Sequence, residues 1–340
     1  MKTTINIFTA FILCFLAGCE GPAEKKEPLT VTIQPPKEGK ELLTVDFQQG
    51  RSLRYKFVSG RDIDLDWDPT KSKTKPGKSS VDKSYESMEM VVTYTPIEVD
   101  PYGLTTIKAT CESVTATRSK RPSGRAAARD AVEQLPGKTF TLKVNAAGKI
   151  EDPSKLDELI KQIGEKAFRP STRGGRIKEP DMILDFIASQ WFLWDSVSSI
   201  EKPIEGVSVG QSWSSKLSVP TPMVIRKARD VTYTLDEIRK TEKGRLAVIS
   251  STYTLADSVP STWPIPYTGS FQMSGTFGFL RGYKILSLKG QGQELFNIDK
   301  GQTEQYDQQY RMQVEAVLPM ITGPKPRITI NQKLTMQLIN

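Results

Sequence analysis

Long stretches of this 340-residue chain alternate apolar and polar residues one by one. Residues 53–58 and 63–67 are short examples, and 88–99 and 104–117 are long ones that flank the sequence Asp-Pro-Tyr-Gly. A period of two places apolar side chains on one face of a β-strand, and Asp-Pro-x-Gly is typical of a turn. The pattern therefore predicts antiparallel strands, two of them joined in a long hairpin.

The same pattern predicts further strands at residues 140–144, 211–219, 224–238, 245–254, 271–280, 283–288, 294–298, 303–318 and 327–339. Helical periodicity predicts three helices, at 125–135, at 153–168 behind a capping Asp152, and at 182–197. We therefore expect an α+β fold that is mainly antiparallel β. It should form two packed β-rich units, 43–200 with the three helices and 201–340 with strands almost alone.

The N-terminus has the features of an export signal. Lys2 precedes an apolar run over residues 5–17, which is shorter than the ~20 residues that span a bilayer. The run ends in Leu16-Ala17-Gly18-Cys19, which resembles the lipobox of bacterial lipoproteins. The resemblance implies that residues 1–18 are removed as a lipoprotein signal peptide. It also implies that Cys19 carries a diacylglycerol and palmitate-type acyl chains, which anchor the protein in a membrane.

Two further features bear on location. Residue Glu20 follows the lipidated cysteine, and by the sorting rule of these lipoproteins this favours the outer membrane of the cell envelope, facing the periplasm or the cell surface. Residues 19–42 hold four prolines among Lys and Glu, which predicts a flexible tether. A short edge strand at 29–33 is the alternative for part of that segment.

The cysteine and histidine content excludes several kinds of cross-link, catalytic site and metal site. After removal of Cys14 and lipidation of Cys19, only Cys111 remains, so the mature fold has no internal disulfide. The chain has no histidine, which excludes Ser-His-Asp catalysis and histidine-ligated metals. No glycine-rich phosphate loop is present either. We therefore expect no catalytic residue, no metal, no cofactor and no enzymatic activity.

An acidic run invites a calcium interpretation, which the spacing disfavours. Its members alternate along one strand: Asp62, Asp64, Asp66 and Asp68. An EF-hand loop starting at the first of them needs Gly at the sixth position and Glu at the twelfth, where Trp67 and Lys73 stand instead. The run is better interpreted as the solvated face of a strand.

The net charge of +8 is mild for this length and does not indicate nucleic-acid binding. Basic residues gather in three loops: Lys71, Lys73, Lys75, Lys78 and Lys83; Arg118, Lys120, Arg121, Arg125 and Arg129; Arg169, Arg173, Arg176 and Lys178. The plainer interpretation is solubility. The sharper one is contact with lipid head groups, an envelope protein or an anionic envelope polymer.

The most apolar helix, 182–197, repeats Ile183, Ile187, Trp191 and Trp194 at helical spacing. The favoured interpretation is a core helix that lies across a sheet. The alternative is a ligand or lipid slot formed by Trp191 and Trp194.

The run Val-Ser-Val-Gly-Gln-Ser-Trp at 207–213, together with the strand, glycine and helix of 140–163, is similar to an uncharacterised domain family of secreted bacterial proteins. The resemblance covers most of 43–340 and implies two packed β-rich halves with no established activity. The sequence thus favours a membrane-tethered envelope lipoprotein with a non-enzymatic binding or scaffolding role. The alternative is a carrier that shelters a lipid or other apolar ligand in a β half-barrel.

Overall fold

The computed structural model describes residues 39–70, 81–119, 130–167, 176–177, 182–194, 205–219, 227–260, 272–273, 280–318 and 323–339. The chain divides into two units, Met1–Ile33 and Gln34–Asn340, and the features below all belong to the second. The predicted signal peptide, Cys19 and the short strand expected at 29–33 lie outside the described residues.

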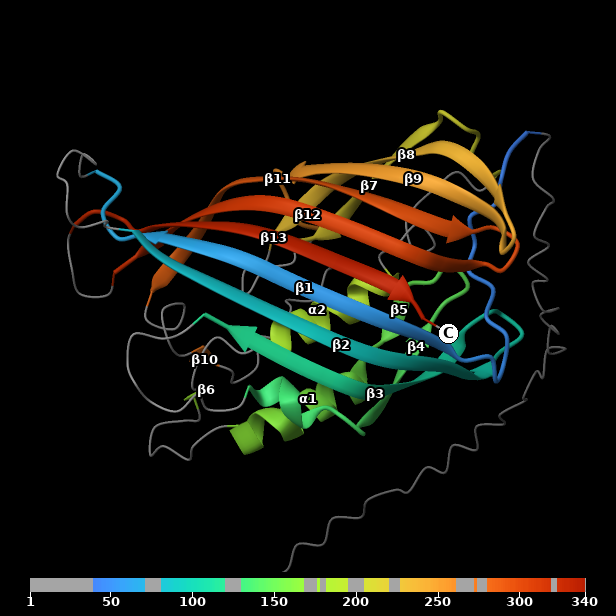
Figure 1. The fold of residues 1–340 in the computed structure, drawn as a ribbon, viewed down its shortest axis with the longest axis horizontal. Helices are drawn as coiled ribbons and strands as arrows, with labels where there is room; N and C mark the ends of the chain where they lie inside the picture. Colours follow the sequence, from blue (N-terminus) through green and yellow to red (C-terminus); the bar gives the residue numbers. More distant parts are fainter. Residues whose placement is uncertain are drawn as a thin grey trace, which may run out of the picture. The chain divides into compact units, whose positions relative to one another are not determined.

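Eleven strands form one antiparallel sheet (Figure 1). They are β1 (Leu53–Asp66), β2 (Val81–Val99), β3 (Thr105–Arg118), β4 (Thr139–Val144), β5 (Ile150–Asp152), β7 (Ser212–Ser218), β8 (Ala228–Thr241), β9 (Gly244–Leu255), β11 (Arg281–Asn297), β12 (Gln302–Val317) and β13 (Arg327–Leu338). Their order is β5-β4-β3-β2-β1-β13-β12-β11-β9-β8-β7. A separate parallel pair joins β6 (Arg176–Ile177) to β10 (Gln272–Met273).

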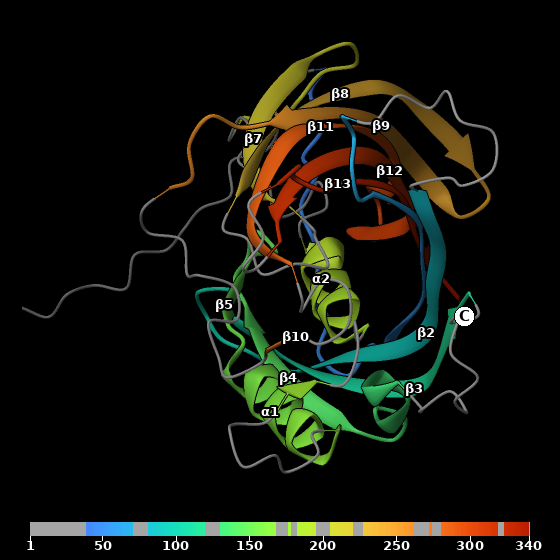
Figure 2. The ribbon, with the colours of Figure 1, turned by 90° about the vertical axis from the view of Figure 1, so that its left-hand side faces the viewer.

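The long strands arise from the alternation seen in the sequence. In β1, every second side chain from Tyr55 to Leu65 is buried, and the residues between them are more exposed. The sheet curves, and Figure 2 shows helix α2 (Ile183–Trp194) inside the curve. The alternation thus gives every long strand one face toward the interior of the curve.

The expected α+β class was wrong. Among the described residues there are two α-helices, α2 and α1 (Ser154–Ala167), which lies where the 153–168 helix was predicted. The helix predicted at 125–135 is reduced to a single 3-10 turn, Ala131–Gln134, and 125–129 lie outside the described part. Asp130 caps this turn at Val132 N, and Pro136-Gly137 follow it at once, which leaves no room for a longer helix there.

The prediction of two packed β-rich units was also wrong. β1 pairs with β13 from Tyr55↔Leu338 to Asp66↔Arg327, so the N-terminal and C-terminal halves of the chain share one sheet. Two buried apolar clusters do exist, but both draw on β1, β12 and β13. The prediction of antiparallel strands was correct, and the β2–β3 hairpin forms around Asp100, which accepts hydrogen bonds from Tyr102 N and Leu104 N.

The segment before β1 crosses one end of the sheet. Glu41 pairs with Val207, Asp46 N donates to Gly301 O at 3.0 Å, and Gly50 N donates to Pro96 O at 2.8 Å. Leu43 is fully buried in the apolar cluster that includes residues of β7, β8 and β9. Phe47 packs against the second cluster, which includes residues of α1 and α2. The segment therefore covers the ends of both halves of the apolar interior, which lie on the right in Figure 1.

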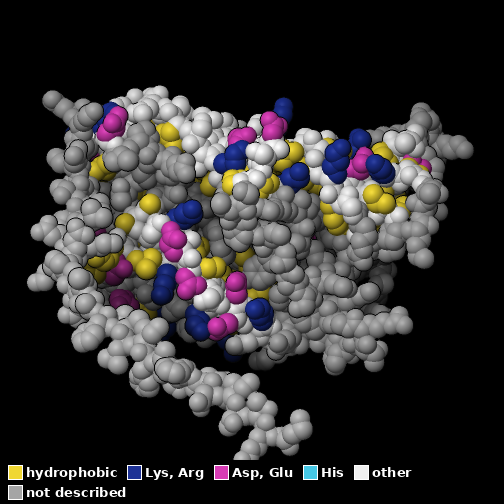
Figure 3. Space-filling model, turned by 180° about the vertical axis from the view of Figure 1, so that it is seen from behind, with side chains coloured by type: hydrophobic (Ala, Val, Ile, Leu, Met, Phe, Trp, Pro, Cys, Tyr) yellow, Lys and Arg dark blue, Asp and Glu magenta, His cyan; other side chains and the backbone are white. Residues whose placement is uncertain are grey.

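Seen from the opposite side, described Lys and Arg side chains are mixed with Asp and Glu on the surface, without a large patch of one sign (Figure 3). Most members of the three basic loops lie outside the described residues. Within the part of the chain that is described, neither helix is long and apolar enough to cross a membrane.

Candidate functional site

Helix α2 carries its polar residues on the side that faces the sheet. Asp185, Ser189 and Gln190 are 4%, 0% and 0% exposed. Gln190 accepts a 2.6 Å hydrogen bond from the Tyr94 hydroxyl of β2, and Ser189 Oγ donates to the carbonyl of Asp185 at 2.7 Å. All other residues of this helix are apolar. The arrangement is the inverse of a surface helix, whose polar side normally faces water.

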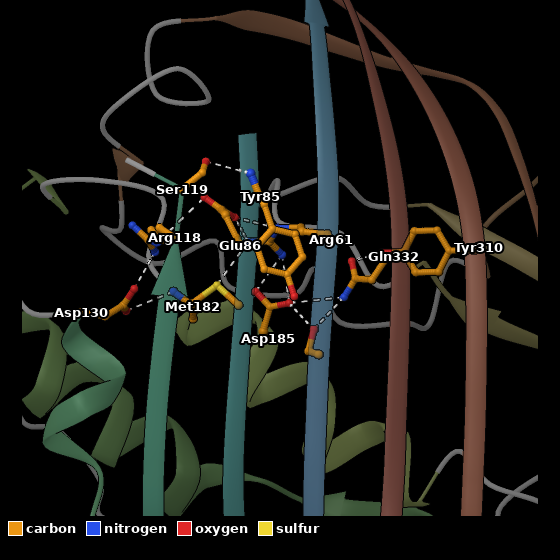
Figure 4. A network of polar contacts seen from close by, with 11 residues as sticks. Arg61, Tyr85, Glu86, Arg118, Ser119, Asp130, Met182, Asp185, Tyr310 and Gln332 are labelled. Carbon is orange, nitrogen blue, oxygen red and sulfur yellow. Dashed lines mark hydrogen bonds and ion pairs between the residues drawn. The ribbon is translucent and has the colours of Figure 1, made fainter. Parts of the chain in front are cut away.

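Arg61 of β1 binds α2 to the sheet (Figure 4). Its Nη1 donates to both Asp185 carboxylate oxygens at 2.9 and 2.8 Å, and its Nε donates to Glu86 Oε2 at 2.7 Å. The Arg61 side chain is 1% exposed. Burial alone lowers the pKa of this guanidinium, but Asp185 and Glu86 raise it by more, so the pKa lies above its ordinary value. Arg61 is therefore a charged residue fixed between two carboxylates.

Neutral polar groups extend this contact toward β12. Ser59 Oγ donates to Asp185 Oδ1 at 3.1 Å, and Gln332 Nε2 donates to Ser59 Oγ at 3.0 Å. The Tyr310 hydroxyl donates to Gln332 Oε1 at 2.6 Å. Every one of these side chains is buried. The carboxylate of Asp185 thus receives donors from both β1 and β13.

On the β3 side, Arg118 pairs with Asp130 at 2.6 Å and approaches Glu86 at 3.9 Å. The other oxygen of Asp130 accepts from the backbone N–H of Met182, just before α2 begins. This second ion pair therefore holds the start of the helix, one turn before the contact at Asp185.

These residues form one row across the sheet, because their strand partners lie side by side. The register pairs Arg118 with Glu86, Glu86 with Arg61, Arg61 with Gln332, and Gln332 with Tyr310. The row continues through Gly290 of β11 to Tyr253 of β9. A polar band therefore crosses the inner face between the two apolar clusters.

The far end of the band holds a second buried arginine. Arg229 of β8 is 3% exposed, lies with its Cζ 4.6 Å from the centre of the Tyr253 ring, and donates to Gln308 Oε1 at 3.1 Å. The Tyr253 ring covers Gly290, where a Cβ atom would collide with it. Burial raises the pKa of Tyr253 to about 12, although Arg229 opposes the shift.

The neighbouring row contains two buried donors. Ser251 of β9 pairs in register with Tyr233 of β8, which pairs with Trp213 of β7. The Trp213 and Tyr233 rings stack with centres 5.8 Å apart. Ser251 Oγ and Trp213 Nε1 are both buried and have no hydrogen-bond partner.

The charged groups of the polar band hold one another in place. Both carboxylates around Arg61 are occupied by that guanidinium, and the thiol of Cys111 is buried with its pKa raised to about 12, so it stays protonated. Across the described ranges no three His, Cys, Asp or Glu side chains gather as metal ligands. In the acidic run, Asp66 and Asp68 instead accept the backbone N–H groups of Asp68 and Thr70.

The structure does not describe the side chains of the site residues that the sequence predicts. Trp191 and Trp194 belong to α2, but their side chains lie outside the described part, as does Cys19. The sequence patterns did not predict the polar band. Its signal was present, because Arg61 stands at a position of the inward-facing alternation in β1, and Asp185 is the single acid of an apolar helix.

Comparisons with known proteins add little. No family model matches the chain, and no curated protein matches it. Among solved structures, a lipovitellin chain from a structure described as "lipid-protein interactions in lipovitellin" aligns with a TM-score of 0.45 and 12% identity, over 87% of this chain and 26% of that chain. The present chain therefore spans about a quarter of the lipovitellin chain, and a likeness this distant assigns it no function.

Proposed function

We propose that this protein is a membrane-tethered envelope lipoprotein that carries a lipid, or another ligand with acyl chains, inside the curve of its sheet. The ligand lies against the apolar side of α2. The protein acts by binding and not by catalysis. Its place in the cell is the envelope, most simply the outer membrane, with the chains on Cys19 as the anchor.

The observation that carries this proposal is the inverse polarity of α2. All three of its polar residues, Asp185, Ser189 and Gln190, are buried, and its other residues are apolar. The described apolar side chains of the helix, Phe186 and Leu193 among them, are buried in an apolar cluster. Such surroundings suit acyl chains, since burying apolar area gains about 25 cal/mol per Å².

The polar band supports the same function. A helix held by apolar packing alone can slide or settle deeper into a curved sheet. The contacts of Asp185 with Arg61 and of Asp130 with the start of α2 give the helix a single position. Fixed in this way, it keeps a constant space beside it for a ligand.

Lipid content of the purified protein tests the proposal. We expect organic extraction of the mature, acylated protein to release about one lipid per chain, as measured by mass spectrometry. The covalent chains on Cys19 stay with the protein and do not interfere. Trp191→Ala and Trp194→Ala should each lower this lipid content, since each removes a large apolar group from α2.

Tyr102→Ala provides the control. Tyr102 lies in the turn between β2 and β3 and is 66% exposed, so its loss should leave the lipid content unchanged. Protein that is free of lipid and that fails to bind an apolar fluorescent probe would overturn the carrier function. That result would favour the scaffolding role that the sequence first suggested.

The anchor is tested separately. Cys19→Ser removes the thiol that accepts the diacylglycerol, so the variant should accumulate as an uncleaved precursor that takes up no palmitate analogue. Cys111→Ser should be labelled like the wild type, because this cysteine is buried in β3. Undiminished labelling of the Cys19→Ser variant would contradict the lipoprotein assignment.

A further inference from the structure

We infer that the inner face of β7–β9 contains a site for an anionic oxygen group, a phosphate or a carboxylate, on the bound lipid. The inference rests on the proposed lipid-carrying function and specifies which end of the ligand the sheet recognises. Two buried donors without partners, Ser251 Oγ and Trp213 Nε1, are its main support.

Both donors are buried without an acceptor, which destabilises the ligand-free fold. Ser251 is 3% exposed and Trp213 is 7% exposed, and neither polar atom reaches solvent. A buried donor that lacks an acceptor costs about 1–3 kcal/mol, and folded proteins contain few of them. Both donors here lie in one row of the sheet, on either side of Tyr233. Acceptor oxygens supplied by a ligand would satisfy them.

Positive charge reaches the same row. Gly292 of β11 pairs with Ser251 on one side and with Gln308 on the other, and Gln308 accepts the hydrogen bond from Arg229. The guanidinium of Arg229 therefore lies between the row of Tyr253 and the row that holds Ser251. Guanidinium groups match phosphate and carboxylate oxygens with parallel hydrogen bonds.

Gly292 lies between these groups. A Cβ atom there would lie 2.8 Å from both Ser251 Oγ and the carbonyl oxygen of Asp307, and 3.3 Å from Gln308 Cγ. The absence of a side chain at Gly292 therefore lets the Ser251 hydroxyl and the Gln308 side chain, which binds Arg229, approach each other across β11. Glu294, two residues further along the same face of β11, accepts a 2.6 Å hydrogen bond from Thr303 Oγ1, so its carboxylate has a donor of its own.

The chemistry of the ligand follows from these groups. A serine hydroxyl, an indole N–H and a guanidinium can all donate, so the matching group is rich in acceptor oxygens. The residues around the site are apolar, so acyl chains can begin there and extend toward α2. A phosphate or carboxylate at the head of a lipid satisfies both conditions.

Ser251→Ala and Trp213→Phe test the inference in the full-length protein. Each removes an unpaired buried donor, so the thermal midpoint of the lipid-free protein should stay the same or rise. Affinity for phosphatidylglycerol should fall about tenfold, because each donor is used only by the ligand. The matched control is Ser250→Ala, the next residue of β9, whose Oγ donates to Asp236 on the outer side. It should leave the affinity unchanged.

Three ligands separate the possible sources of the signal. Phosphatidylglycerol should bind at least about tenfold more tightly than a diacylglycerol with the same chains. Inorganic phosphate alone should bind weakly, and Ser251→Ala should weaken it further. Equal binding of the two lipids, unaffected by Ser251→Ala and Trp213→Phe, would overturn the anion site and leave the carrier function standing. Failure of both lipids to bind the wild type would overturn the carrier function itself.

Discussion

Asp185→Ala should lower the free energy of unfolding by about 3–5 kcal/mol. The substitution leaves Arg61 Nη1 buried without the two carboxylate oxygens that it contacts at 2.9 and 2.8 Å. It also removes the acceptor of Ser59 Oγ. This loss is costly because Nη1 has no access to water, even though Glu86 still pairs with the other side of the guanidinium. Urea or guanidinium denaturation of the lipid-free protein measures the loss.

The matched control is Asp230→Ala. Asp230 pairs with Lys216 at 2.7 Å, but the two side chains are 54% and 33% exposed, so water replaces the lost contact. Its cost should be about 0–1 kcal/mol. Similar losses for the two variants would mean that the Arg61 contact does not hold α2 on the sheet. Asp185→Ala should also reduce the bound lipid, because α2 then loses its fixed position.

Gly301→Ala should cost about 2–4 kcal/mol. Gly301 has φ +56°, and a Cβ atom there would collide with Asp46 N. The alanine variant must therefore give up the 3.0 Å hydrogen bond from Asp46 N to Gly301 O, in addition to adopting an unfavourable left-handed conformation. The segment over residues 39–52 should then separate from the sheet end and become sensitive to limited proteolysis.

Gly210→Ala isolates the conformational part of that effect. Gly210 has φ +81°, but a Cβ atom there meets nothing within 4 Å. Its substitution should cost only about 1–2 kcal/mol and leave proteolysis of 39–52 unchanged. Equal stability losses at the two glycines, with no added cleavage in Gly301→Ala, would show that the segment is not held at this point.

Local structure was predictable where one short pattern determines it. The β2–β3 hairpin follows from alternation on both sides of Asp100-Pro101-Tyr102-Gly103, and α1 follows from the helical spacing of 153–168. Errors arose where charged residues or glycines interrupt a pattern. The predicted strands 53–58 and 63–67 are one strand, β1, and 283–288 and 294–298 are one strand, β11, because neighbouring strands keep the interrupting residues extended.

Sequence by itself determined that the chain would be built from antiparallel strands with one apolar face, since side-chain alternation is a local property of the backbone. It also determined that no disulfide joins parts of this fold. Only the tertiary structure decided that these strands form a single sheet, because the pairing of β1 with β13 joins segments from opposite ends of the chain. The position of the polar band also depends on the tertiary structure. Arg61 and Asp185 are 124 positions apart, and the stability of each inside the fold depends on a partner that no local pattern identifies.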